Sequence, residues 1–154
     1  MALSYLGLGT NLGNKEQNLH AAIQLISTNV GEIVQQSGIY QTAAQGFESE
    51  NLFLNAVILV NTELTPTQLL SKTQEIEQQL GRTEKSNGNY SDRLIDIDIL
   101  LYDRLITNQL TLKIPHPLIT EREFVLKPLL EIAPELLHPI TGISFATYFI
   151  KLKK

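Results

Sequence analysis

Two aspartates, separated by a single residue, lie within an otherwise apolar segment. Asp96 and Asp98 alternate with isoleucines in the run Leu-Ile-Asp-Ile-Asp-Ile-Leu at 94–100. This alternation predicts a β-strand whose isoleucines share one face while both carboxylates share the other, about 6.5–7 Å apart along the strand. Oxygen ligands without any cysteine in the chain suit magnesium that is held jointly with substrate phosphates. The competing interpretation is a half-exposed strand whose acidic side chains face water, and the motif alone leaves the two at about even odds.

Basic residues flank this pair on both sides. Arg82 and Arg93 precede it, and His116 follows between two prolines that restrict its backbone. Phosphoryl transfer needs a metal to organise the phosphates and cations to stabilise developing charge, so this combination indicates that chemistry. A surface charge or a turn histidine is the alternative for each residue taken singly.

A glycine-rich segment lies near the start of the chain, at 7–13, with the sequence Gly-Leu-Gly-Thr-Asn-Leu-Gly. Its spacing matches neither G-x-G-x-x-G nor the Walker phosphate loop, and the chain has no Walker lysine. We therefore predict a strand-to-helix turn here and expect any nucleotide to bind in another way.

The elements that must position these residues follow a recognisable order. The patterns predict strands at 3–8, 32–41 (weakened at Gly38), 53–62 and 94–102, with helices over 15–27 and from Thr65-Pro66 to Gly81. The order β-α-β-β-α-β predicts a ferredoxin-like α+β fold, an antiparallel sheet with helices mainly on one face and additional C-terminal elements. The polar connections 41–51 and 82–92 are long enough to act as binding loops or lids.

Length and composition limit the classes of protein. The 154 residues are 43% hydrophobic, contain no cysteine and carry a net charge of −4. One domain over 1–154 is expected, without disulfides, thiolate metal sites or a thiol nucleophile. The acidic balance disfavours broad capture of nucleic acid. No signal peptide or membrane-spanning segment is evident, so we expect a cytoplasmic protein with no membrane partner.

Several stretches occur together in a specific order. They are Leu8-Gly9-Thr10-Asn11-Leu12-Gly13, Gln41-Thr42 with Gly46, Phe53-Leu54-Asn55-Ala56, Gly81-Arg82, the segment 93–100, and Pro115-His116-Pro117 through 121–126. Together they resemble the 6-hydroxymethyl-7,8-dihydropterin pyrophosphokinase family over roughly residues 3–139. The resemblance implies a ferredoxin-like fold and, in folate biosynthesis, transfer of the β,γ-pyrophosphoryl group of ATP to the hydroxymethyl oxygen of the pterin, with release of AMP.

The resemblance also implies a role for each site residue. Asp96 and Asp98 would bind two magnesium ions that bridge the ATP phosphates, and Arg82 and Arg93 would be catalytic. The ATP contacts would be Gln74, Glu77, Arg82, Arg93, His116 and Arg122. The pterin contacts would be Thr42, Phe53, Asn55 and Phe124.

The pterin residues also have simpler interpretations. Phe53 and Phe124 have the flat surfaces that a bicyclic ring needs, although aromatic residues at such positions more often pack in a core. Asn55 is harder to explain in that way, because an amide facing inward from an apolar strand needs hydrogen-bond partners.

Several positions depart from the family pattern, namely Ala43-Ala44, Glu84, Ser91, Asp92 and Thr111. They suggest an alternative, a catalytically weakened paralogue that binds a nucleotide or metabolite on the same fold. Two further rivals are an RNA-binding module, disfavoured by the acidic balance, and a metal-dependent phosphohydrolase that turns over ATP without a pterin. We expect small-molecule substrates and a monomer.

Overall fold

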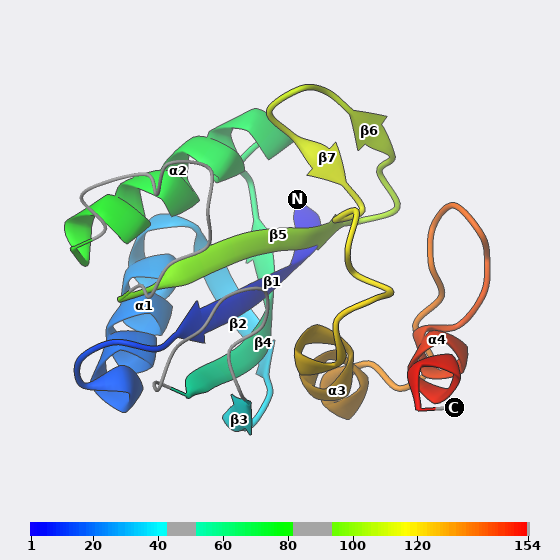
Figure 1. Cartoon of the computed structure of the whole chain (residues 1–154). Coiled ribbons are helices and arrows are strands. Elements are labelled where there is room, and N and C mark those ends of the chain that lie inside the picture. Colours follow the sequence, from blue (N-terminus) through cyan, green and yellow to red (C-terminus); the bar gives the residue numbers. More distant parts are fainter. Residues whose placement is uncertain (43–51, 82–93, 154) are drawn as a thin grey trace.

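An antiparallel sheet divides the molecule into two layers of helices (Figure 1). The computed structural model describes residues 1–42, 52–81 and 94–153. The strands are β1 (Ala2–Thr10), β2 (Gly31–Gln36), β3 (Tyr40–Thr42), β4 (Phe53–Thr62) and β5 (Asp96–Tyr102), with a separate pair of β6 (Thr107–Asn108) and β7 (Lys113–Ile114). The helices are α1 (Lys15–Asn29), α2 (Pro66–Gln79), α3 (Glu123–Ile132) and α4 (Phe145–Leu152).

The order of the strands is that of a ferredoxin-like sheet. Within the described residues the strands run β2-β4-β1-β5, and β3 pairs with β4 beyond the end of β2. Every pairing in this sheet is antiparallel. With α1 between β1 and β2 and α2 between β4 and β5, the predicted α+β fold is confirmed.

The two faces of the sheet build two separate cores. Leu6, Leu8 and the isoleucines of β5 pack with α1 and α2 on one face. Val57 and Leu100 pack with α3 and α4 on the other. Figure 1 shows α1 and α2 on one side of the sheet and α3 and α4 on the opposite side. The sequence prediction left the C-terminal helices unplaced, and they cover the face toward which the aspartates of β5 point.

Local sequence signals account for the ends of the helices. Asn14 caps α1, accepting a hydrogen bond from the Gln17 amide at 3.2 Å. Thr65 and Gln68 form a reciprocal capping box at the start of α2, with Pro66 in the first turn. Gly81 follows α2 with φ of +112°, a conformation that favours glycine. The predicted start of α2 at Thr65-Pro66 and its end at Gly81 are confirmed.

The glycine-rich segment joins β1 to α1, as predicted, although the strand extends further into it than expected. β1 continues through Gly7 and Gly9 to Thr10, so the turn occupies only the residues that follow. Because β1 has a strand on each side, its backbone groups are satisfied in the sheet despite the low strand propensity of glycine. The predicted strand over 32–41 is two strands, interrupted at 37–39 around Gly38.

None of the described helices is long and apolar enough to cross a membrane.

Candidate active site

Four strands contribute to one row of residues on the face that α3 and α4 cover. Gly9 is the register partner of Asn55 in β4 and of Asp96 in β5, and Asn55 is also the partner of Tyr40 in β3. Register partners lie on the same face of an antiparallel sheet with their Cβ atoms about 4.5–5.5 Å apart. The sheet therefore places a buried amide and a carboxylate on either side of a glycine.

The aspartate pair lies as the alternation predicted. Asp96 and Asp98 are half-buried, whereas Ile95, Ile97 and Ile99 are buried in the core beneath α1 and α2. The next residue on the aspartate face, Leu100, packs in the core beneath α3 and α4. Both carboxylates thus project from β5 toward the same layer of the molecule, which is the arrangement that two oxygen ligands for a hard cation require.

Arg122 connects this pair to the aromatic wall of the site. Its Nη1 atom lies 3.8 Å from Oδ2 of Asp98, and the two side chains are 18% and 30% exposed. Its guanidinium also lies 5.5 Å from the ring centroid of Phe124. Arg122 is the N-cap residue of α3 and Phe124 lies in the first turn, so one helix start places a cation beside the carboxylates and an aromatic ring beside the cation.

His116 is held at the free edge of β5 by backbone and side-chain bonds. Its amide donates to the Leu100 carbonyl at 3.0 Å, and its Nδ1 accepts from the Leu118 amide at 3.1 Å. Burial, reinforced by the positive charge of Arg122, lowers the pKa of His116 to about 4, although Asp96 acts in the opposite direction. The imidazole is therefore neutral near pH 7, and because Nδ1 accepts, Nε2 carries the proton and is a donor.

The pterin candidates of β3 and β4 are also brought together. Asn55 is 4% exposed, and its Nδ2 donates to Oγ1 of Thr42 at 2.8 Å. Its Oδ1 faces Gly9, where a Cβ atom would stand 3.1 Å away. Phe53 is half-buried two residues before Asn55 and hence on the same face. The amide thus has a fixed orientation, with its oxygen over a residue where an added Cβ atom would be crowded.

The two α2 candidates lie differently from each other. Glu77 is buried, and its Oε2 accepts a hydrogen bond of 2.8 Å from the amide of Ile97, between the two aspartates. Gln74 lies one turn earlier on the same helix, and its side chain is exposed. The structure therefore brings Glu77 to the backbone of the aspartate strand and leaves Gln74 on the surface of α2.

Both catalytic candidates, Arg82 and Arg93, fall outside the described residues, as does most of the two long connections. Within the described residues no cluster of three or more His, Asp or Glu could hold a metal by itself. Two carboxylates nevertheless fit magnesium, which commonly keeps waters and takes its remaining ligands from substrate phosphates.

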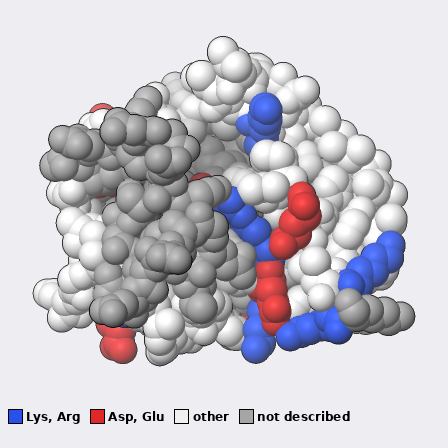
Figure 2. Space-filling model, viewed as in Figure 1, with Lys and Arg blue, Asp and Glu red and all other residues white. Residues whose placement is uncertain are grey.

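Some of the charges around this layer form ion pairs. Figure 2 shows acidic and basic side chains next to each other over the region of α3 and α4. Two ion pairs lie there: Arg122 with Asp98 at 3.8 Å, and Lys153 with Glu123 at 2.5 Å. Arg122, the cation beside the aspartate pair, is therefore partly balanced by a carboxylate.

Gly9 is not among the site residues that the sequence predicts. The glycines are expected at the end of the first strand and in the turn after it, although the spacing Gly-x-Gly within an apolar run is also typical of a strand face that must stay open. The strand register links Gly9 to the candidate site, because it puts this residue between Asn55 and Asp96.

The chain is similar to known proteins over most of its length. Residues 5–134 match the family model described as 7,8-dihydro-6-hydroxymethylpterin-pyrophosphokinase (HPPK). A 2-amino-4-hydroxy-6-hydroxymethyldihydropteridine pyrophosphokinase from Porphyromonas gingivalis is 48% identical over 143 residues, covering 90% of this chain and 95% of that protein. The protein of the same description from Aquifex aeolicus is 41% identical over 140 residues, covering 91% and 86%.

Larger proteins contain a similar unit. The folic acid synthesis protein fol1 of Pneumocystis carinii is 43% identical over 148 residues, which is 96% of this chain but 20% of that protein. The solved structure of wild-type HPPK-DHPS from Plasmodium falciparum superposes with a TM-score of 0.78 at 17% identity, covering 97% of this chain and 44% of that one. The chain thus spans less than half of that solved chain, and the likeness to it concerns the fold.

Proposed function

The chain belongs to the 7,8-dihydro-6-hydroxymethylpterin-pyrophosphokinase family, and on this premise we propose that it transfers pyrophosphate from ATP to the hydroxymethyl group of 6-hydroxymethyl-7,8-dihydropterin in folate biosynthesis. The observation that carries this proposal is the row Asn55–Gly9–Asp96. It places a group suited to the edge of a pterin and a group suited to a phosphate-bound cation on opposite sides of an open strand.

The pterin would lie over Gly9 and contact β3, β4 and α3. Asn55 can present its amide oxygen to a donor on the ring edge, since its nitrogen is already engaged by Thr42. Phe53 and Phe124, both half-buried, offer aromatic faces for stacking. This arrangement would direct the hydroxymethyl substituent toward Asp96.

The triphosphate would lie along β5 and the start of α3. Asp96 and Asp98 would hold magnesium, which when bound supplies positive charge that orients the phosphates and stabilises the charge developing on them. Arg122 lies beside Asp98 as a fixed cation, and the neutral His116 offers an Nε2–H donor that does not depend on pH near neutrality. Arg82 and Arg93 remain our candidates for contact with the transferring group, and Gln74 and Glu77 for the nucleoside.

In the reaction, the hydroxymethyl oxygen forms a bond to the β-phosphorus while the bond from that phosphorus to the α-phosphate bridging oxygen breaks. AMP leaves, and the hydroxyl proton is released. We attribute the rate to positioning of the two substrates and to electrostatic stabilisation. Gly9 lies between the two groups of residues. On one side Asn55 would position the pterin, and on the other side Asp96 would position the triphosphate.

The test is a coupled assay for AMP with magnesium, ATP and the dihydropterin. We expect AMP and the pterin diphosphate in equal amounts, and only background AMP or ADP when the pterin is omitted. ATP turnover without a pterin would instead support the phosphohydrolase. Binding of both ligands with no AMP would support the weakened paralogue. Nothing in the described residues favours that alternative: Thr111 is exposed, and Glu84, Ser91 and Asp92 lie outside them.

A further inference from the structure

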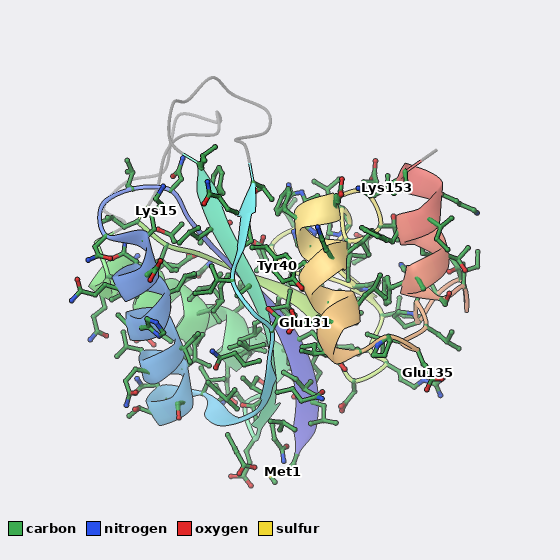
Figure 3. The ribbon with its side chains drawn as sticks, turned by 90° about the horizontal axis from the view of Figure 1, so that it is seen from below. Met1, Lys15, Tyr40, Glu131, Glu135 and Lys153 are labelled. Atoms are coloured by element: carbon green, nitrogen blue, oxygen red, sulfur yellow. The ribbon has the colours of Figure 1, made fainter. Side chains whose placement is uncertain are left out.

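A carboxylate on α3 receives three hydrogen bonds from the link between β2 and β3. The amide of Gly38 donates to Oε1 and Oε2 of Glu131 at 3.1 and 3.2 Å. The hydroxyl of Tyr40 donates to Oε1 at 2.5 Å. Figure 3 shows Tyr40 and Glu131 meeting between the sheet and α3. We call these three residues the Glu131 cluster.

The Glu131 cluster joins two elements that carry different walls of the proposed pterin pocket. β3 contains Tyr40 and Thr42, and the hydroxyl of Thr42 fixes the amide of Asn55. α3 contains Phe124 in its first turn and Glu131 in its last. A displacement of β3 relative to α3 would therefore change the space between the Asn55 amide and the Phe124 ring.

Little else within the described residues holds β3 in place. β3 has three residues and pairs only with β4 there. On its N-terminal side, Ser37 ties the link to β4: its amide donates to the Val57 carbonyl, and its Oγ accepts from the Val57 amide, both at 2.9 Å. That contact fixes the link to the sheet but not to the helix, so the connection to α3 depends on the Glu131 cluster, with Lys127 adding a contact 5.8 Å from the Tyr40 ring centroid.

The three bonds of the Glu131 cluster lie at the surface, and all of them end on a charged acceptor. A carboxylate that accepts from a hydroxyl or an amide makes shorter and stronger bonds than two neutral groups do. The hydrogen bond to Glu131 is also the largest cause that raises the pKa of Tyr40, so the phenol stays protonated and remains a donor.

We propose that Glu131 is a positioning residue for the pterin pocket: by holding β3 against α3 it sets the width of the site for a flat bicyclic pteridine, and it does not touch either substrate. This inference rests on the proposed function. It predicts a selective effect, because loss of the Glu131 cluster releases the short strand β3, whereas α3 stays packed on the sheet through its buried core residues and keeps Arg122 beside Asp98.

Glu131→Ala tests the inference in the same AMP assay. We expect its KM for the dihydropterin to rise by about tenfold or more, while its KM for ATP stays within twofold of wild type. Glu131→Gln, which keeps one carbonyl acceptor, should raise the pterin KM by less than about threefold. Glu135→Gln is the matched control, because Glu135 is an exposed carboxylate just past the same helix and points away from the Glu131 cluster (Figure 3). It should leave both KM values unchanged.

A purely structural role gives a different result. Loss of folded protein lowers the apparent kcat and leaves both KM values unchanged, so that outcome in Glu131→Ala, or an equal rise of both KM values, would overturn the inference. If Glu131→Ala does not fold, Tyr40→Phe tests the inference instead, because it removes one of the three bonds to Glu131. A pterin KM raised about threefold would support the inference, and an unchanged pterin KM would contradict it.

The wild-type protein separates this inference from the function on which it rests. AMP formation by wild type with an unchanged pterin KM in the variants defeats only the positioning role. Absence of AMP formation by wild type defeats the proposed function itself.

Discussion

Replacement of Gly9 by alanine would test whether the open strand between Asn55 and Asp96 is part of the site. The added Cβ atom would stand 3.1 Å from Oδ1 of Asn55 and 3.9 Å from Cδ1 of Phe53. Since 3.1 Å is closer than carbon and oxygen normally approach, the amide must move by a few tenths of an ångström. Asn55 is held by its 2.8 Å bond to Thr42, so the shift weakens that bond or misplaces the oxygen offered to the pterin.

The magnitude follows from the bonds at risk. One or two hydrogen bonds of Asn55, each worth about 1 kcal/mol net, correspond to about 1–2 kcal/mol, or about a 5- to 30-fold rise in the pterin KM. Stability should change little, because alanine in a strand gains about 0.5–1 kcal/mol over glycine and offsets the local crowding. We therefore expect loss of pterin affinity without loss of fold.

Gly7→Ala provides the matched control on the same strand and face. Its Cβ atom would meet only the side chain of Leu100, at 3.4 Å, which is ordinary van der Waals contact. We expect wild-type KM values and equal or higher thermal stability. The measurements are KM for each substrate by AMP release and the melting temperature. A pterin KM within twofold of wild type in Gly9→Ala would refute the reasoning.

The remaining predictions concern the carboxylates and the histidine. Asp96→Asn and Asp98→Asn should each nearly abolish AMP formation while keeping or raising the melting temperature, because like-charge repulsion is relieved; retained activity in both would exclude them as metal ligands. Chelation with EDTA should stop the reaction without unfolding the protein, and magnesium should restore it, as activity and circular dichroism would show. Glu77→Leu should lower stability by about 1–3 kcal/mol in urea unfolding, because it orphans the buried amide of Ile97, with Glu77→Gln retaining most of it. The pKa of His116 lies below its ordinary 6.5, at about 4, so its contribution to stability is fully present above pH 6.5 and is lost as the pH falls toward 4; His116→Asn should flatten the melting temperature over that range.

The sequence was sufficient for the fold because its local signals agree with one another. The capping box at Thr65, the alternation around Asp96 and the β-branched run that forms β4 each predict one element, and their order predicts the sheet. The aspartate pair was predictable for the same reason, since periodicity alone decides the face on which a strand residue lies.

What the sequence could not supply depends on register and on contacts between distant elements. No local pattern states that Gly9 lies opposite both Asn55 and Asp96, because the pairing joins three strands that are far apart in the chain. The bond between Glu131 and the β3 link spans more than 90 residues. The neutral state of His116 likewise follows from burial and the nearby Arg122, which no neighbour in the sequence reveals.

The outer border of β5 has a further consequence, for solubility. A strand with one free side exposes backbone groups that can pair with another molecule and start aggregation. Here Glu77 occupies the amide of Ile97 and the His116 amide occupies the carbonyl of Leu100. These two contacts leave fewer free backbone groups on β5 for a second sheet to pair with, so variants at Glu77 would be expected to precipitate more readily in concentrated solution.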